Sequence, residues 1–301
     1  IAAFKTAIEK APNNAAGYYE LGLVYQEQQR SQEAQAAFEQ AFALEPDLVD
    51  ALAQVAALFV ARGQVDKALE RVHHALQTSP HHPRLYNLLA SLLQVQGKNA
   101  EAEEAFKKAL ALDNTLFETY FGLARLYTRT KAYDQAIAQY EGIIKAQPGL
   151  LAPYALVGMI YDLQSHVQKA NEYYQKALKI DPKFAVAANN LAWNYTEHGG
   201  NLDEALALAR SAREQMPDSP QVADTLGWIY YKKQEYPKAI SLLKESVARR
   251  TNDPVIRYHL GMAYYKNGDT GLAKVELQQA LHLRPDFPGA QEARAILAAL
   301  Q

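Results

Sequence analysis

Hydrophobic residues along this chain recur with helical spacing inside a longer repeating unit. Within each half of the unit, apolar residues fall at positions i, i+3, i+4 and i+7, which places them on one face of an α-helix. The unit is 34 residues long, with one step of 35, and its copies begin at residues 15, 49, 83, 117, 151, 185, 220 and 254. A fixed period of this length predicts a series of stacked helix pairs.

Several places in the unit keep one kind of residue throughout. One place is always alanine, another is always small, and the residue three positions after the small one is bulky. The alanines are Ala34, Ala68, Ala102, Ala136, Ala170, Ala205, Ala239 and Ala273, and the bulky residues are Tyr25, Phe59, Leu93, Tyr127, Tyr161, Tyr195, Tyr230 and Tyr264. Small residues let two helices approach closely, and the bulky side chain fills the space beside them. Most copies end in proline, which cannot continue a helix and therefore marks the turn.

This pattern resembles the tetratricopeptide repeat family, and the resemblance covers almost the whole chain. It implies an all-α fold, a right-handed α-solenoid of antiparallel helix pairs, whose first helices line a concave groove that binds peptides or partner proteins. On this basis residues 1–14 are interpreted as the second helix of a truncated preceding repeat, and residues 288–301 as a C-terminal capping helix. The eight repeats between them, residues 15–287, are 15–48, 49–82, 83–116, 117–150, 151–184, 185–219, 220–253 and 254–287.

Composition narrows the class of protein further. The 31 basic and 33 acidic residues give a net charge of −2, which does not favour a nucleic-acid-binding surface. The absence of cysteine excludes disulfides and thiolate metal sites, and it fits a reducing or an oxidising compartment equally well. No apolar run approaches the roughly 18–20 residues that span a bilayer, although a lipid anchor upstream is compatible with the sequence.

The only two tryptophans, Trp193 and Trp228, occupy the same place in consecutive repeats. The resemblance implies that this ninth place, like the fifth and the twelfth, faces the groove. Tryptophan, tyrosine and methionine are typical of protein-binding surfaces. The partner-binding groove is therefore predicted to include Tyr19, Phe121, Arg125, Met159, Asn189, Trp193, Asp224, Trp228, Tyr231, Tyr258, Met262 and Tyr265. The alternative is that these side chains pack on the neighbouring repeat.

Other groups of residues give weaker indications of a binding, metal or catalytic site. The fifth places lack the lysine of a carboxylate clamp, and only Asn190 occupies the sixth place where an asparagine ladder would run. The four histidines His73, His74, His81 and His82 are more typical of a surface than of a metal site, because adjacent helical residues diverge by about 100°. No catalytic constellation appears, so we expect no enzyme, no catalytic residue, no cofactor and no metal.

The sequence therefore predicts a non-enzymatic scaffold that binds a protein or peptide partner, mainly through residues 151–287. The stretches NNLAWNYTEHGG, DTLGWIYYKK and YHLGMAYYKNGD resemble bacterial tetratricopeptide proteins of envelope and exopolysaccharide-export systems, including exosortase-associated lipoproteins. That resemblance favours the periplasm or outer membrane over the cytoplasm. Two alternatives stay open: an architectural module that self-associates as a homo-oligomer, and the regulatory array of a longer enzyme.

Overall fold

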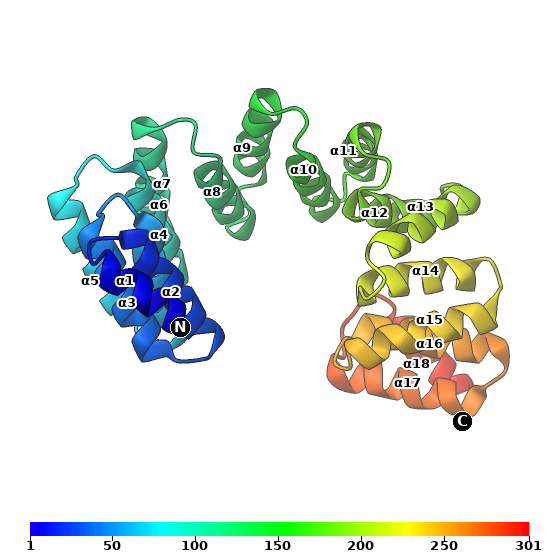
Figure 1. Ribbon diagram of the computed structural model, residues 1–301. Helices are drawn as coiled ribbons and strands as arrows, with labels where there is room; N and C mark the ends of the chain where they lie inside the picture. The colour runs from blue at the N-terminus through cyan, green and yellow to red at the C-terminus, as the bar shows by residue number, and fades with distance from the viewer. Residues whose placement is uncertain (301) are drawn as a thin grey trace. The chain divides into compact units, whose positions relative to one another are not determined.

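The computed structural model describes residues 1–300 and is built of α-helices, with no strand in that range (Figure 1). The chain divides into two compact units, Ile1–Ile143 and Ile144–Gln301. The helices of the first unit are α1 (Ala2–Lys10), α2 (Ala15–Glu27), α3 (Ser31–Leu44), α4 (Val49–Ala61), α5 (Val65–Thr78), α6 (Pro83–Val95), α7 (Asn99–Leu112), α8 (Phe117–Arg129) and most of α9 (Tyr133–Ala146).

The second unit continues the same alternation. Its helices are α10 (Leu151–Leu163), α11 (Val167–Ile180), α12 (Ala185–Glu197), α13 (Leu202–Gln215), α14 (Pro220–Lys232), α15 (Tyr236–Arg249), α16 (Pro254–Asn267), α17 (Thr270–Leu283) and α18 (Ala290–Ala299). Helices α2 to α17 thus form eight pairs in register with the sequence period. The expected all-α solenoid of helix pairs is confirmed.

The turn inside each pair has the same backbone conformation. One residue per repeat adopts a positive φ there: Gly63, Gly97, Gly199 and Gly268 in four repeats, and Gln29, Lys131, Ser165 and Gln234 in the other four. Glycine takes this conformation without strain, and a single polar residue tolerates it at modest cost. Proline begins α6, α14 and α16, where its fixed φ suits the first helical position.

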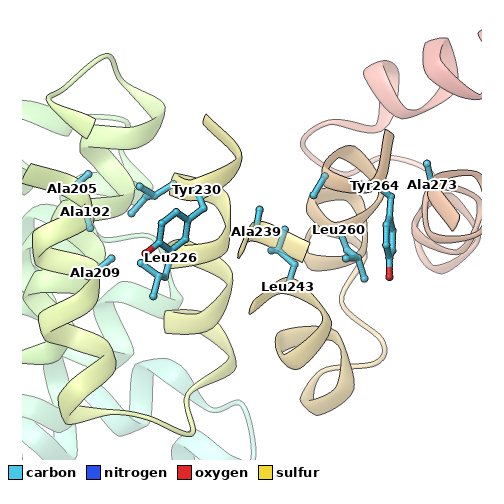
Figure 2. Close-up of a cluster of buried hydrophobic side chains, with 12 residues drawn as sticks. Ala192, Ala205, Ala209, Leu226, Tyr230, Ala239, Leu243, Leu260, Tyr264 and Ala273 are labelled. Atoms are coloured by element: carbon cyan, nitrogen blue, oxygen red, sulfur yellow. The ribbon is translucent and has the colours of Figure 1, made fainter. Parts of the chain in front are cut away.

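Small residues bring the two helices of a pair together. The eight alanines of the invariant place are all fully buried. In the first repeat, a Cβ added to Gly22 would lie 2.5 Å from the ring of Phe38, so the ring occupies the space that glycine leaves. Figure 2 shows the same principle in the second unit, where Leu226 and Tyr230 of α14 pack toward Ala192, Ala205 and Ala209.

Neighbouring repeats make contact chiefly between the second helix of one and the first helix of the next, and their first helices also touch. Within the second unit α12 lies against α14, and α14 against α16, while each second helix packs on the first helix of the following repeat. Helix α18 packs on α16 and α17 and buries Ala290, Ala293 and Ile296 against them. First helices of successive repeats therefore share one face of the unit, and that face carries the candidate site.

Candidate partner-binding site

A polar pocket of about 560 Å³ opens on the first-helix face of the second unit. Helix α12 contributes one wall, the start of α14 contributes the next, and the turn that leads into α16 closes the third side. The lining residues are Asn189, Asn190, Trp193, Gln221, Asp224, Thr225, Arg250, Asn252, Asp253, Pro254, Val255, Ile256 and Arg284. This volume falls in the range of pockets that bind small groups or short segments.

Trp193 supplies the aromatic wall of this pocket. Its side chain is only partly buried, and its ring centroid lies 5.7 Å from that of His259 in a tilted arrangement. Asn189, one helical turn earlier on α12, contributes an amide group to the same pocket. Its Oδ1 atom is shielded from solvent and accepts no hydrogen bond from the protein. A buried acceptor without a donor is costly, so a ligand N–H or O–H at this point would be favoured.

The charges around the pocket are mostly paired. Asp224 Oδ1 lies 2.9 Å from His259 Nδ1, and both residues are buried. Arg250 lies 3.3 Å from Asp253 across a single turn. Arg284, which follows α17, is exposed, and within residues 1–300 it takes part in no ion pair of the kind found for Arg250. The pocket therefore offers a guanidinium to an incoming acceptor, beside several amide groups.

Trp228 has a different environment from Trp193. It is 5% exposed, and its ring stacks on Tyr231 at 4.4 Å and on His259 at 4.1 Å between centroids. Its Nε1–H donates to Glu197 Oε1 at 2.8 Å. Residues from α16, α17 and α18 complete this cluster. The indole therefore packs between helices and satisfies its polar atom internally.

The structure corrects the expectation that both indoles offer open surface. Trp228 of α14 is buried in one cluster with Tyr258 and Met262 of α16, and residues of α17 and α18 complete it. Tyr258 donates to Glu292 Oε2 of α18 at 2.7 Å, and burial together with this bond holds the pKa of Tyr258 well above its usual range. Asp224 is also buried, although one side of it still lines the polar pocket.

The remaining predicted residues are dispersed. Tyr231 and Tyr265 are partly buried beside the Trp228 cluster, and burial raises the pKa of Tyr231 to about 12. In the first unit, Tyr19 packs on Phe38 and Phe121 packs edge-on to Tyr140, at centroid distances of 5.6 and 5.8 Å, while Arg125 is exposed. The structure thus joins only Asn189, Trp193 and Asp224 in the polar pocket.

Met159 lies in a separate, smaller pocket of about 350 Å³ that also includes Asn190. It is 44% exposed, and Leu163, one turn further along α10, is 62% exposed. Since Asn190 lines both pockets, this apolar pair continues the site along the first-helix face.

Sequence reasoning missed a buried polar network between the fifth and sixth repeats. Asn194 donates to Asp162 Oδ1 at 2.8 Å and to Asn171 Oδ1 at 2.9 Å, and Tyr174 donates to Asp162 Oδ2 at 2.5 Å. Asn194 is 4% exposed and Tyr174 is fully buried. Sequence reasoning also missed Arg250 and Arg284, because they lie in turns that a first-helix pattern ignores. For Arg250, the polar residues grouped before Pro254, which starts α16, were the available signal.

The histidines considered for metal binding do not gather. His73, His74 and His81 are exposed, and within residues 1–300 no group of three or more histidine or acidic side chains has a geometry that would hold an ion. In the same range, no helix is both long enough and apolar enough to cross a bilayer.

Fold and site together define a helical-repeat protein with a polar, aromatic-walled pocket on its first-helix face. Family models of the tetratricopeptide repeat match residues 25–92, 93–160 and 164–229, and others match 3–36, 227–268 and 255–287. The chain belongs to the tetratricopeptide repeat family.

The curated relatives include subunits of large assemblies. Mouse BBSome complex member BBS4 is 25% identical over 263 residues, which are 76% of this chain and 50% of that protein. Anaphase-promoting complex subunit cut9 of Schizosaccharomyces pombe is 26% identical over 197 residues, 63% of this chain and 29% of that protein. The human protein O-mannosyl-transferase TMTC1 is 27% identical over 192 residues, 63% of this chain and 22% of that protein. The chain spans half or less of the length of these relatives.

Solved structures show the same fold. The APC/C heterotetramer Cut9–Hcn1 matches with a TM-score of 0.67 and 20% identity, over 97% of this chain and 56% of that one. A tetratricopeptide repeat protein from Parabacteroides merdae matches with a TM-score of 0.59 and 17% identity, over 83% and 98%. The curated relatives named above are eukaryotic, so they lend no support to a bacterial envelope setting.

Proposed function

We propose that this chain is a protein-interaction scaffold that binds an extended segment of a partner in the pocket between α12, α14 and the turn before α16. The observation that carries the proposal is Asn189, whose buried Oδ1 has no hydrogen-bond donor although it faces a pocket of about 560 Å³. A backbone N–H of a bound segment would supply that donor.

The rest of the pocket supports a polypeptide ligand. Trp193 offers the exposed part of a ring to an apolar side chain, and Arg284 offers a guanidinium to a carboxylate or carbonyl. Beyond Asn190, Met159 and Leu163 offer an exposed apolar strip for further residues of the segment. Because the walls are helices held by buried contacts, binding costs little protein entropy.

A library of random peptides displayed on phage tests the proposal directly. We expect selection on the wild-type chain to enrich peptides whose binding is lost with Trp193→Ala and with Asn189→Leu. Leu23→Ala, at the equivalent place of the first repeat, is the matched control and should leave binding unchanged. Enriched peptides that bind Trp193→Ala and Asn189→Leu as well as the wild type would place the docking surface elsewhere.

The finer setting stays a hypothesis. A role in a bacterial envelope or polysaccharide-export assembly is favoured only by the amino-acid sequence of the sixth to eighth repeats. Fractionation of cells that contain the native protein tests it. Self-association and service to a longer enzyme are separate hypotheses, which light scattering and the full reading frame test. TMTC1 is an example of a longer enzyme with a similar segment. It is named as a transferase, and the match to this chain covers 22% of the length of TMTC1.

A further inference from the structure

The third repeat contains an apolar pocket of about 610 Å³ that has no role in the function proposed above. It lies in the first unit, on the side of the second helices, with α6 as its floor and with α5 and α7 as its walls. Leu89, Leu93, Ala105 and the ring of Tyr86 form the apolar surface, and His73 of α5 contributes a polar group at one side. The Tyr86 hydroxyl donates to the Pro80 carbonyl oxygen at 2.9 Å.

This pocket lacks an aromatic ring that the other seven repeats have at the equivalent place. Leu93 is the only residue at its place in the repeat that is not aromatic. In the other seven repeats a ring occupies this place and is largely buried or partly buried: Tyr25, Phe59, Tyr127, Tyr161, Tyr195, Tyr230 and Tyr264. The third repeat therefore has a leucine where its neighbours have a ring.

In three repeats the hydroxyl group of this ring bonds to the preceding second helix. Tyr127 donates to Glu103, the fifth residue of α7, at 3.0 Å, and the other two bond to the ninth residue. Gln175, the ninth residue of α11, donates to the Tyr195 hydroxyl oxygen at 3.0 Å. Arg210, the ninth residue of α13, donates to the Tyr230 hydroxyl oxygen at 2.8 Å. The ninth residue of α5 is His73, which lines the pocket. The third repeat thus has a polar residue at the place that bonds the phenol in the sixth and seventh repeats, while its own ring is missing.

The sixth repeat provides an internal measure of the missing volume. Its equivalent groove, lined by Leu191, Tyr195 and Leu208, measures about 400 Å³. Leu93 replaces Tyr195 and Ala105 replaces Leu208 in the third repeat, where the groove measures about 610 Å³. Both replacements are large to small. Glu104 and Lys108 replace Ala207 and Ser211 in the opposite sense, yet the groove of the third repeat is the larger of the two.

We propose that this pocket binds the side chain of a tyrosine from a partner protein, with the ring between Leu89, Leu93 and Ala105 and the hydroxyl at His73. A second copy of this chain is a poor donor, because none of the large hydrophobic side chains that are exposed in residues 1–300 is aromatic. Burial of one such ring removes on the order of 200 Å² from water.

Charges at the rim complement a basic residue in the partner segment. Lys107 is paired with Glu103 at 2.7 Å, and Lys108 lies over the Tyr86 ring, 4.4 Å from its centroid. Glu101 and Glu104, which lie along the first half of α7 at the pocket, therefore match a partner segment with a basic residue beside its tyrosine.

NMR of leucine methyl groups with p-cresol, the tyrosine side-chain analogue, tests the site. We expect saturable shifts of Leu89 and Leu93 in the wild type. In Leu93→Tyr, the shifts of Leu89 should disappear while the melting temperature stays at or above that of the wild type, since this fold accommodates the ring in other repeats. Leu93→Phe repeats the test without a hydroxyl.

Two further arms complete the experiment. Tyr195→Leu combined with Leu208→Ala rebuilds the pocket in the sixth repeat, and p-cresol should then shift Leu191 as well. A short peptide with one tyrosine beside a lysine should displace p-cresol, and its Tyr→Ala version should not. Unfolding of both Leu93 variants, unchanged p-cresol shifts in them, or binding of p-cresol without competition by the peptide would each overturn the proposal.

Discussion

The indole of Trp228 and the imidazole of His259 lie stacked, with ring centroids 4.1 Å apart and an interplanar angle of 24°. His259 in turn bonds to Asp224 and tilts against Trp193, which is the partly exposed end of this aromatic series. The two tryptophans therefore have different roles: Trp228 joins α14 to α16, and Trp193 presents the end of the same stack to the polar pocket.

Loss of Trp228 should destabilise the second unit. Trp228→Ala removes a ring that is 5% exposed and leaves Glu197 without its indole donor, so we expect a loss of about 3–5 kcal/mol. Urea unfolding followed by circular dichroism measures it. Trp193→Ala should cost clearly less, since that ring is already partly in water. Equal losses for the two variants would contradict the division of roles.

The approach of α18 to α16 depends on a residue without a side chain. Gly289 has φ +98°, and a Cβ there would lie 2.5 Å from the ring of Tyr258. Gly289→Ala should therefore loosen α18, with a loss of about 1–3 kcal/mol and faster hydrogen exchange in α18.

Gly142 in the interior of α9 is the matched control for that substitution. An added Cβ at Gly142 meets no atom within 4 Å. Gly142→Ala should stabilise the chain by about 0.5–1 kcal/mol, because alanine favours the helix. A loss of stability on Gly142→Ala would show that glycine substitutions here report something other than contact and propensity.

Stability should fall at alkaline pH through Tyr140. Burial raises the pKa of this phenol from its ordinary value of 10.0 to about 12. Above pH 10 the unfolded chain loses the proton while the folded chain keeps it, so the stabilisation is complete below pH 10 and declines toward pH 12. At about 1.4 kcal/mol per pKa unit, the decline reaches roughly 2–3 kcal/mol.

Chemical denaturation at a series of pH values between 8 and about 12 measures this effect. Tyr140→Phe should reduce the slope of stability against pH in that window. Tyr18→Phe, which removes the hydroxyl of a ring that is only partly buried, is the control for the substitution itself. An identical slope in wild type and Tyr140→Phe would assign the alkaline loss to other groups, such as Tyr231.

Substitution of Asn194 should cost more stability than substitution of an exposed asparagine. Asn194→Ala leaves the facing oxygens of Asp162 and Asn171 without their donor in a buried site, so we expect a loss of about 1–3 kcal/mol by thermal unfolding. Asn13→Ala, at an exposed turn, should change stability by less than about 0.5 kcal/mol. A neutral result for Asn194→Ala would mean that solvent replaces the lost bonds.

Sequence alone predicted the architecture because the architecture depends on periodic residues. The alanine place and the small place repeat in every copy, and the ring place in all but the third, so the helix pairs and their register follow from spacing. The open part of the groove does not repeat. Whether a ring at the ninth place is covered depends on what the next first helix and α18 present to it, and no single repeat contains that information.

Individual residues show the same division. Trp193 and Trp228 are identical by position, yet α16 and α18 bury only the second. Arg250 and Arg284 enter the pocket from turns, where composition varies from copy to copy. Conversely, Leu93 became informative only when the pocket around it could be compared with the one around Tyr195.

The bonds of Asn194 have a consequence for how this array can change. Asn194 on α12 requires Asp162 on α10 and Asn171 on α11, and other repeats have different residues at those places. The fifth and sixth repeats are thus matched to each other by these hydrogen bonds. Shuffling, deleting or duplicating either repeat would break the bonds. Modules that look interchangeable in sequence have, at this junction, a fixed order.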